Sequence, residues 1–209
     1  MSDHYFAADP HSVEKRLSVE VSVWGRRLRL QSASGVFSAG RLDPGTAVLF
    51  RETQPPTRAG TYLDLGCGYG VIACALAAVV PDAEVWAVDV NERALRLCHD
   101  NADTLGVADR VHVATPERVP DDVVFDEIWS NPPIRIGKPA LHDLLLSWLP
   151  RLGPNGRAVL VVGKNLGADS LQRWIVDQGF GCDRLSSAKS FRVLEVRRPP
   201  PAPPCDSSG

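Results

Sequence analysis

The pattern that most limits the fold of this 209-residue chain is a glycine-rich turn between a predicted strand and a predicted helix. Residues 61–65 have the composition of a short strand, and residues 71–80 form an apolar helical run that Pro81 ends. Three glycines lie between them, in residues 66–70. Glycines at such a turn let the backbone approach a ligand closely, and the N–H groups line the helix N-terminus. The pattern therefore predicts a βα unit with a ligand site at its turn.

Strand and helix patterns continue to alternate after this turn. Strands are predicted at 84–90, 110–114, 125–130 and 158–162, and helices from an Asn91 cap toward Gly106, at 139–149 and at 170–178. Such alternation implies a mostly parallel sheet with helices on both faces, because right-handed crossovers cover each side. Two last runs, 182–185 and 191–196, have no helix between them, so we expect one to be antiparallel. The prediction is an α/β, Rossmann-like fold with a seven-stranded sheet.

The residues before this core predict a β-hairpin. Polar and apolar residues alternate over 17–24 and over 26–31, and Gly25 marks the turn. A loop-like segment, 32–41, and the turn sequence Asp43-Pro-Gly then lead into a short helix. We expect three parts: residues 1–50 as a hairpin with a segment that covers the site, 51–198 as the α/β core, and 199–209 as a disordered tail rich in Pro and Ser.

Composition indicates a soluble globular protein. Apolar residues make up 44% and charged residues 23%, and no apolar stretch is long enough to cross a bilayer. The opening residues are polar and lack an apolar signal region, so we expect a cytoplasmic protein with no membrane contact. Five scattered cysteines without a Cys-x-x-Cys pair predict free thiols and no metal site. A net charge of −2 argues against indiscriminate nucleic-acid binding, so any RNA contact must be local.

The spacing of the glycines separates two kinds of cofactor site. A dinucleotide site takes Gly-x-Gly-x-x-Gly, whereas Gly66, Gly68 and Gly70 stand at every second residue and follow Asp64. An acid there is unsuited to a pyrophosphate but suits an ammonium group, such as that of a methionine moiety. Asp89, at the end of the next strand, is placed to accept two hydrogen bonds from a ribose diol. A steric turn and an ordinary capping aspartate are the alternatives.

A second motif, Asn131-Pro132-Pro133, follows the strand at 125–130. Proline fixes its own φ and disfavours a helical residue before it, so Asn131 and Pro132 are held extended. The Asn131 side-chain oxygen and the Pro132 carbonyl can each accept an N–H of an exocyclic amine. The lone pair of that nitrogen then points toward an incoming methyl group, and the catalytic gain comes from positioning and oriented dipoles. A rigid strand-ending turn is the alternative.

Together these motifs resemble those of class I S-adenosylmethionine-dependent methyltransferases of the small-domain group. The likeness lies in Asp64–Gly70, Val88–Asn91 and Asp126–Pro133, and the segments Gly35–Ser38 and Leu42–Thr46 resemble the RsmC-type 16S ribosomal RNA guanine-N2 methyltransferases. The resemblance implies S-adenosylmethionine as cofactor and methylation of guanine N2 in small-subunit ribosomal RNA. Ribosomal RNA or the small ribosomal subunit is then the expected partner.

The motif chemistry and the resemblance together assign residues to the site. The expected catalytic residues are Asn131, Pro132 and Pro133; the cofactor residues are Asp64, Gly66, Cys67, Gly68, Gly70, Asp89, Val90 and Asn131; and the substrate residues are Phe37, Ile134, Arg135 and Lys138. Asp43 is expected near the site. In the family an aromatic residue usually follows Asn-Pro-Pro and stacks on the base, but Ile134 occupies that position here. Stacking then falls to Phe37, or apolar contact replaces it.

Basic residues flank these motifs. Six of them could form a positive rim for phosphate contacts, or an ordinary solvated face: Arg26, Arg27, Arg29, Arg41, Arg135 and Lys138.

Other functions fit parts of the pattern. The same chemistry could act on adenine N6 of RNA or DNA, or on a glutamine amide of a protein. A non-catalytic module that only binds S-adenosylmethionine is a different class, favoured by Ile134. A nicotinamide oxidoreductase is disfavoured by the glycine spacing.

Overall fold

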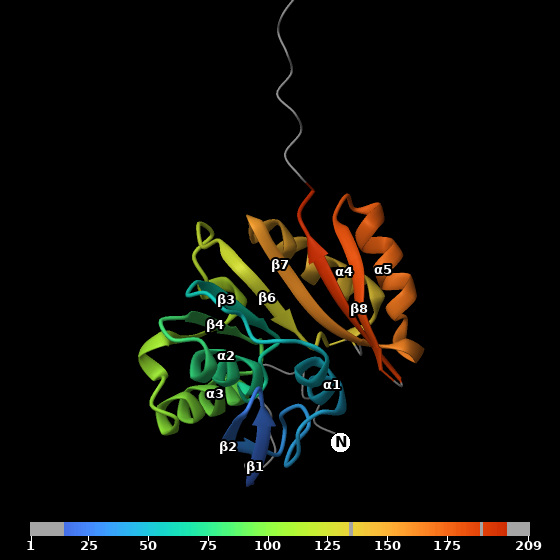
Figure 1. The fold of residues 1–209 in the computed structure, drawn as a ribbon. Helices are drawn as coiled ribbons and strands as arrows, with labels where there is room; N and C mark the ends of the chain where they lie inside the picture. The colour runs from blue at the N-terminus through green and yellow to red at the C-terminus, as the bar shows by residue number, and fades with distance from the viewer. Residues whose placement is uncertain (1–14, 134–135, 189, 200–209) are drawn as a thin grey trace, which may run out of the picture.

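A seven-stranded sheet forms the centre of the fold in the computed structural model, which describes residues 15–133, 136–188 and 190–199 (Figure 1). Its strands are β3 (Thr61–Leu65), β4 (Glu84–Val88), β5 (Val111–Ala114), β6 (Phe125–Ser130), β7 (Leu152–Gly163), β8 (Gly181–Ala188) and β9 (Phe191–Arg197). Their order is β5-β4-β3-β6-β7-β9-β8. Strands β3 to β7 pair in parallel, and β9 is antiparallel to both its neighbours. The predicted fold class is confirmed, and β9 is the antiparallel strand.

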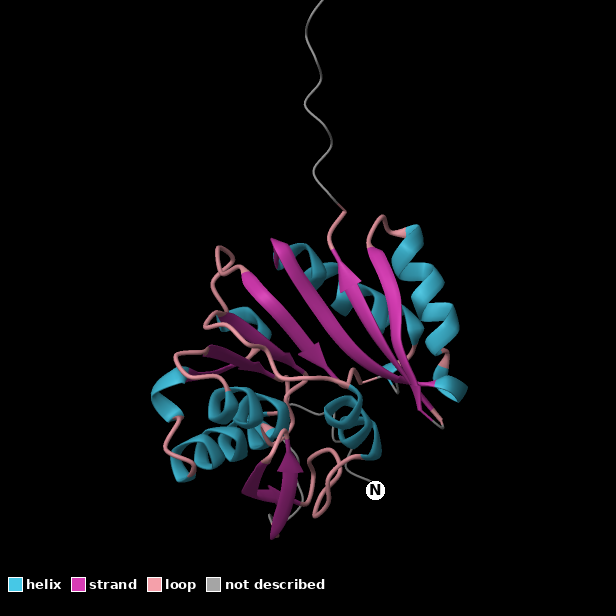
Figure 2. Cartoon of the chain, in the orientation of Figure 1, coloured by secondary structure: helices cyan, strands magenta, loops and turns pink. Residues whose placement is uncertain are grey.

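Helices cover both faces of this sheet (Figure 2). On one face lie α1 (Pro44–Glu52), α2 (Val71–Val79) and α3 (Glu92–Thr104); on the other lie α4 (Lys138–Trp148) and α5 (Ala168–Asp177). Short 3-10 turns join them: η1 (Ala108–Arg110), η2 (Pro116–Arg118), η4 (Leu149–Arg151) and η5 (Lys164–Leu166). Strand β7 shows why the run 158–162 is apolar throughout, because Val159 and Val161 face the first set of helices and Leu160 and Val162 the second.

The N-terminal hairpin, β1 (Arg16–Val23) and β2 (Arg26–Ala33), is confirmed and lies beside α1, α2 and α3 (Figure 1). Its turn is Trp24-Gly25, with φ angles of 45° and 78°, the two positive values that a type I′ hairpin turn requires. Trp24 was expected at the end of the strand, but it lies in the turn. Its ring meets Phe50 and Trp129 edge-on at 5.0 and 5.5 Å, and Nε1 donates to the Thr53 carbonyl at 3.0 Å. The turn is therefore anchored in the core.

Asn101 of α3 joins the hairpin to the glycine-rich turn. Its Nδ2 donates to the carbonyls of Gln31 (2.9 Å) and Tyr69 (2.8 Å), and its Oδ1 accepts from the Gln31 N–H at 2.6 Å. The side chain is 1% exposed. Because buried backbone groups of two segments depend on this one amide, α3 holds both segments in place.

The start of α3 holds the residues that follow the hairpin. Asn91 caps the helix by accepting from the Ala94 N–H, and its Nδ2 donates to the Gly35 carbonyl at 3.1 Å. Arg93 donates to the Ser34 carbonyl at 2.9 Å. Residues 34–43, called the covering segment below, therefore begin at a fixed point beside the end of β4.

Several boundaries differ from the predicted ones. Strand β4 ends at Val88, so Asp89 and Val90 lie in the loop after it. Strand β7 begins at Leu152 rather than at 158, because Leu152 pairs with Phe125 across a register shift that periodicity does not reveal. Of the predicted tail, only Pro199 lies within the described residues. The division into units 1–50 and 51–198 stays a prediction. None of the helices in the described ranges is long and apolar enough to cross a membrane.

The role of Asn101 predicts the effect of its removal. We expect Asn101→Ala to lower the free energy of unfolding by about 3 kcal/mol, because it leaves buried backbone groups without partners. Protection of the β2 amides against hydrogen exchange should fall with it. Exposed Asp103 on the same helix offers a matched control, and Asp103→Ala should change neither quantity. Urea unfolding that showed equal stability for both variants would contradict this role.

Candidate active site

The carboxyl ends of β3, β4 and β6 meet at one edge of the sheet, where a cavity of about 380 Å³ opens. The loops after these strands supply much of its wall: Gly66, Gly68, Asp89, Val90, Asn91, Asn131, Pro132 and Pro133. The covering segment adds Phe37, Arg41 and Asp43. Two motifs that are far apart in the sequence therefore face one cavity.

The three glycines of the turn have different reasons to be glycine. All have positive φ: 76° at Gly66, 54° at Gly68 and 86° at Gly70. A Cβ at Gly70 would lie 2.4 Å from the Cys98 sulfur, so this glycine is needed for packing and does not line the cavity. A Cβ at Gly68 would meet nothing within 4 Å, so the backbone there borders open space. The ligand and steric interpretations of the turn thus apply to different glycines.

Asp64 is buried near the end of β3, and one of its two carboxylate oxygens has no hydrogen-bond partner among the described residues. Its Oδ2 accepts from the Ala73 N–H at 2.8 Å, while no described residue hydrogen-bonds to Oδ1. A chamber of about 30 Å³, lined by Asp64, Cys67 and Asp43 among others, adjoins the main cavity. Burial raises the pKa of Asp64 to about 7, with the Ala73 N–H lowering it and the Asp89 charge adding to the rise. An unpaired, buried carboxylate oxygen fits an ammonium group.

Asp89 lies in the loop after β4, where backbone N–H groups orient its carboxylate. Its Oδ2 accepts from Gly68 and its Oδ1 from Asn91, both at 2.9 Å. Burial raises the pKa of Asp89, and the backbone N–H groups of Asn91, Gly68 and Val90 oppose that rise. Each oxygen keeps a lone pair for a ligand hydroxyl. Val90, 48% exposed, lines the same part of the cavity.

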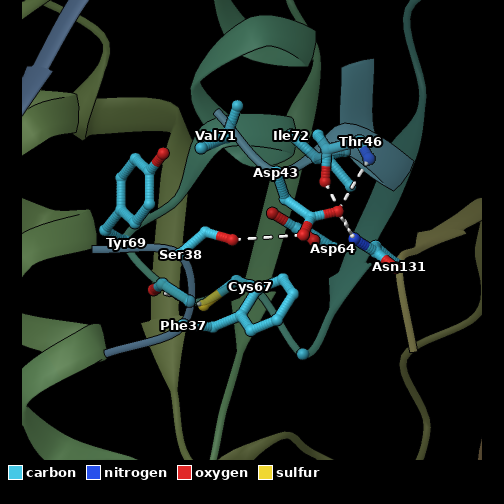
Figure 3. A pocket seen from close by; sticks show the side chains of 12 residues that line it. Phe37, Ser38, Asp43, Thr46, Asp64, Cys67, Tyr69, Val71, Ile72 and Asn131 are labelled. Carbon is cyan, nitrogen blue, oxygen red and sulfur yellow. Dashed lines mark hydrogen bonds between the residues drawn. The ribbon is translucent and has the colours of Figure 1, made fainter. Parts of the chain in front are cut away.

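The carboxamide of Asn131 follows β6 and is held from one side. Its Nδ2 donates to Asp43 Oδ1 at 2.6 Å and to Thr46 Oγ1 at 3.1 Å, and its oxygen points away from Asp43 (Figure 3). The Ser130 hydroxyl donates to the Leu65 carbonyl at 2.6 Å, which ties the ends of β6 and β3 together. The start of the Asn-Pro-Pro motif is therefore fixed to both the sheet and α1.

Asp43 caps α1 and is the centre of the covering segment's hydrogen bonds. Its Oδ1 accepts from the N–H groups of Gly45 (2.7 Å) and Thr46 (3.2 Å), and its Oδ2 accepts from the Ser38 hydroxyl at 3.1 Å (Figure 3). The Tyr69 hydroxyl donates to the Arg41 carbonyl at 3.0 Å. The covering segment is thus bonded directly to the glycine-rich turn.

The expected substrate residues are only partly at the cavity. Phe37 lines both the cavity and the chamber. Lys138 is exposed at the start of α4 and does not line the cavity. Ile134 and Arg135 lie outside the described residues.

The predicted positive rim is not formed by the hairpin. The predicted rim includes four arginines that precede the α/β core, and of these only Arg41, in the covering segment, lines the cavity. Arg26 and Arg27 are exposed on β2, and Arg29 pairs with Glu20 at 3.1 Å. These hairpin residues are exposed to solvent, and their contact with phosphates stays a prediction.

Sequence reasoning missed Phe191, which also lines the cavity. A Cβ placed on Gly45 would lie 3.1 Å from Phe191 Cε1 and 3.3 Å from Asn131 Nδ2, so the ring lies close to the Asn131 amide. Because β9 is antiparallel, its first residue stands at the edge where the parallel strands end. The sequence indicated that one of the last two strands is antiparallel but not which one, and the position of Phe191 depends on that choice.

The four described cysteines, Cys67, Cys74, Cys98 and Cys182, are buried and free. Within the described ranges, no three His, Cys, Asp or Glu side chains come together as a metal site would need. The cavity, the open backbone at Gly68 and the unpaired oxygen of Asp64 fit S-adenosylmethionine.

Two known proteins show what the whole chain is similar to. It is 32% identical over 201 residues to uncharacterized protein YbxB of Bacillus subtilis (strain 168), covering 95% of this chain and all of that protein. It is 32% identical over 180 residues to the Pasteurella multocida (strain Pm70) ribosomal RNA small subunit methyltransferase C, covering 81% of this chain but 52% of that enzyme. The chain thus spans about half the length of that enzyme.

A solved structure supports the same architecture. The T. thermophilus 16S rRNA N2 G1207 methyltransferase (RsmC), in complex with AdoMet and guanosine, superposes with a TM-score of 0.75 at 23% identity. The match covers 88% of this chain and 50% of that one, and at this identity it shows the fold. The profile of the methyltransferase small domain matches residues 27–195. The predicted enzyme class and methyl donor are confirmed, and the chain belongs to the methyltransferase small domain family.

Proposed function

We propose that this chain transfers a methyl group from S-adenosylmethionine to an exocyclic amine, guanine N2 of small-subunit ribosomal RNA. One observation carries the proposal: the glycine-rich turn and Asn131-Pro132-Pro133 line the same cavity. A donor at the turn and an acceptor at the Asn-Pro-Pro motif would therefore meet. If the glycine-rich turn and the Asn-Pro-Pro motif lined separate cavities on opposite sides of the sheet, the reaction would be excluded.

The cofactor half of the cavity offers a partner for each polar part of the methyl donor. Asp64 Oδ1 would take the ammonium of the methionine moiety, and Asp89 the ribose hydroxyls. The loop residues Val90 and Asn91, with Pro116, would border the adenine. Glu117, next to Pro116, is exposed and does not line the cavity.

The described residues of the substrate half supply hydrogen-bond acceptors. S-adenosylmethionine provides an electrophilic methyl group, and the residues here orient the nucleophile toward it. Asn131 Oδ1 and the Pro132 carbonyl would accept the two amine hydrogens, so the nitrogen lone pair turns toward the methyl group. Transfer would form the bond from nitrogen to the methyl carbon while the carbon–sulfur bond of the donor breaks, and a proton of the amine would then leave to solvent.

The choice of ribosomal RNA rests on the relatives. The Pasteurella enzyme is named a ribosomal RNA small subunit methyltransferase, and the solved relative is named an N2 methyltransferase with guanosine bound. This chain matches about half of each. We propose that the rim of the cavity contributes to RNA affinity. Ribosomal RNA or the assembled small subunit is the proposed partner.

Two aromatic rings take the place of the one usually found after Asn-Pro-Pro. Phe37 comes from the covering segment and Phe191 from the start of β9, and both line the cavity. Phe191 lies close to the Asn131 amide, since both are within 3.3 Å of a Cβ placed on Gly45, so we propose that it contacts the target base.

The first test concerns catalysis. Asn131→Ala should lower the rate of labelled methyl transfer to RNA by at least about 100-fold, because an oriented acceptor is lost. Affinity for S-adenosylmethionine, measured by calorimetry, should stay within about threefold, since Asp64 and Asp89, which would hold its ammonium and ribose, lie on other segments. Equal loss of both would mean that Asn131 is structural. Labelling of DNA or protein fractions in place of RNA would overturn the substrate.

The raised pKa of Asp64 predicts a pH dependence. In the free protein, the stability that this group contributes is full below its ordinary pKa of 3.8 and is lost as the pH rises toward about 7. Affinity for the cationic cofactor should change oppositely and rise from about pH 6 to about pH 7.5, because the carboxylate is then charged. Thermal unfolding and calorimetry measure the two trends. Both should weaken in Asp64→Asn, and a stability trend that remains there is expected from Asp89, whose pKa burial also raises. Trends of unchanged size in Asp64→Asn would exclude Asp64 as their source.

Base stacking at Phe191 predicts a change in KM. Phe191→Leu should raise KM for RNA by about 10-fold, because stacking on one base contributes roughly 1–3 kcal/mol. Phe191→Tyr keeps the ring and should restore the KM. If steady-state kinetics gave the same KM for the Leu variant as for the wild type, the base would have to stack elsewhere.

A further inference from the structure

We propose that Asp43 is a positioning residue that sets which way the Asn131 carboxamide faces, so that the site presents only acceptors to the reacting nitrogen. The inference rests on the proposed function and adds to it. It assigns a role to a side chain outside the Asn-Pro-Pro motif and limits the kind of nitrogen that can react.

The argument begins with the two ends of the amide. Asn131 carries two hydrogens on Nδ2 and none on Oδ1. Acceptors lie in front of Nδ2 in two directions, Asp43 Oδ1 at 2.6 Å and Thr46 Oγ1 at 3.1 Å. A carboxylate can only accept, so a flipped amide would bring its oxygen against the Asp43 oxygen with no hydrogen between them. Asp43 therefore favours one of the two amide orientations.

Asp43 can impose this orientation because it is itself held. The N–H groups of Gly45 and Thr46 point at Oδ1, and the Ser38 hydroxyl at Oδ2. The first two belong to the start of α1, which packs on β7 and β9. The amide is thus oriented relative to a helix of the core and not to a loose loop.

The consequence is a restriction on the acceptor. Asn131 and Pro132 both line the cavity, so with both Nδ2 hydrogens engaged, Asn131 Oδ1 and the Pro132 carbonyl would offer only lone pairs to a substrate there. A nitrogen that carries hydrogens is then held in place, whereas a ring nitrogen that is itself an acceptor, such as guanine N7, would face oxygen lone pairs. This restriction agrees with the exocyclic amine of the proposed function.

A pair of substitutions separates positioning from helix capping. Asp43→Ser keeps a capping oxygen for α1, but its shorter side chain does not reach Asn131. Asp43→Asn can keep both, because the Gly45 and Thr46 N–H groups require its oxygen where Oδ1 lies and its NH₂ can donate to Ser38. We expect kcat to fall by about 100-fold in Asp43→Ser and by less than about 10-fold in Asp43→Asn, with KM for S-adenosylmethionine little changed in either.

A second pair tests the other acceptor without touching the cap. Thr46→Val removes the hydroxyl at nearly constant volume, and Thr46→Ser retains it. We expect a lower kcat in Thr46→Val that Thr46→Ser restores.

Side-chain NMR gives a readout that does not depend on activity. In protein labelled with ¹⁵N asparagine, the Asn131 Nδ2 hydrogens should be protected from solvent exchange in the wild type and in Asp43→Asn, and exposed in Asp43→Ser. A Ser variant with wild-type kcat and protected hydrogens would overturn the inference. If the wild type methylated none of the RNA, DNA or protein fractions, the proposed function would fail, and the NMR result would still decide the orientation of the amide.

Discussion

The hydrogen bond between the Asn131 carboxamide and the Asp43 carboxylate joins two parts of the chain that are 88 residues apart. One is the exit of a central strand, and the other is the cap of the helix that precedes the sheet. Both contribute to the cavity wall. Because Asp43 also holds Ser38 and the start of α1, one carboxylate links the covering segment, the helix and the Asn-Pro-Pro motif. The shape of the site depends on this link.

A second set of contacts places the covering segment over the glycine-rich turn. Asn101 bonds to both the hairpin and Tyr69, and Asn91 and Arg93 bond to the first residues of the segment. Helix α3 therefore has two roles. One end starts beside Asp89, which is proposed to meet the ribose, and the interior holds the hairpin. The hairpin is part of the core in energetic terms, since its apolar side chains belong to the same cluster as α2 and α3.

Much of the site could be predicted because its residues follow strands directly. Asp64 is the second-last residue of β3, Asp89 follows β4 and Asn131 follows β6. Parallel strands bring such positions to one edge of the sheet. Phe191 escaped the prediction because it begins a strand. Lys138 does not line the cavity, and its contact with substrate stays a prediction. The chain turns into α4 there, and Lys138 faces solvent.

The sequence by itself determined the fold class, the glycine-rich turn and the residues at the ends of the parallel strands, because periodicity, turn chemistry and strand direction are local properties. Only the tertiary structure decided that Gly70 serves packing while Gly68 borders the cavity, that Asp64 keeps an unpaired oxygen, and that Asp43 holds the Asn131 amide. The physical reason is that hydrogen-bond partners and steric neighbours are chosen by three-dimensional distance. No spacing along the chain encodes a contact between a helix cap and a strand end that lie so far apart in it.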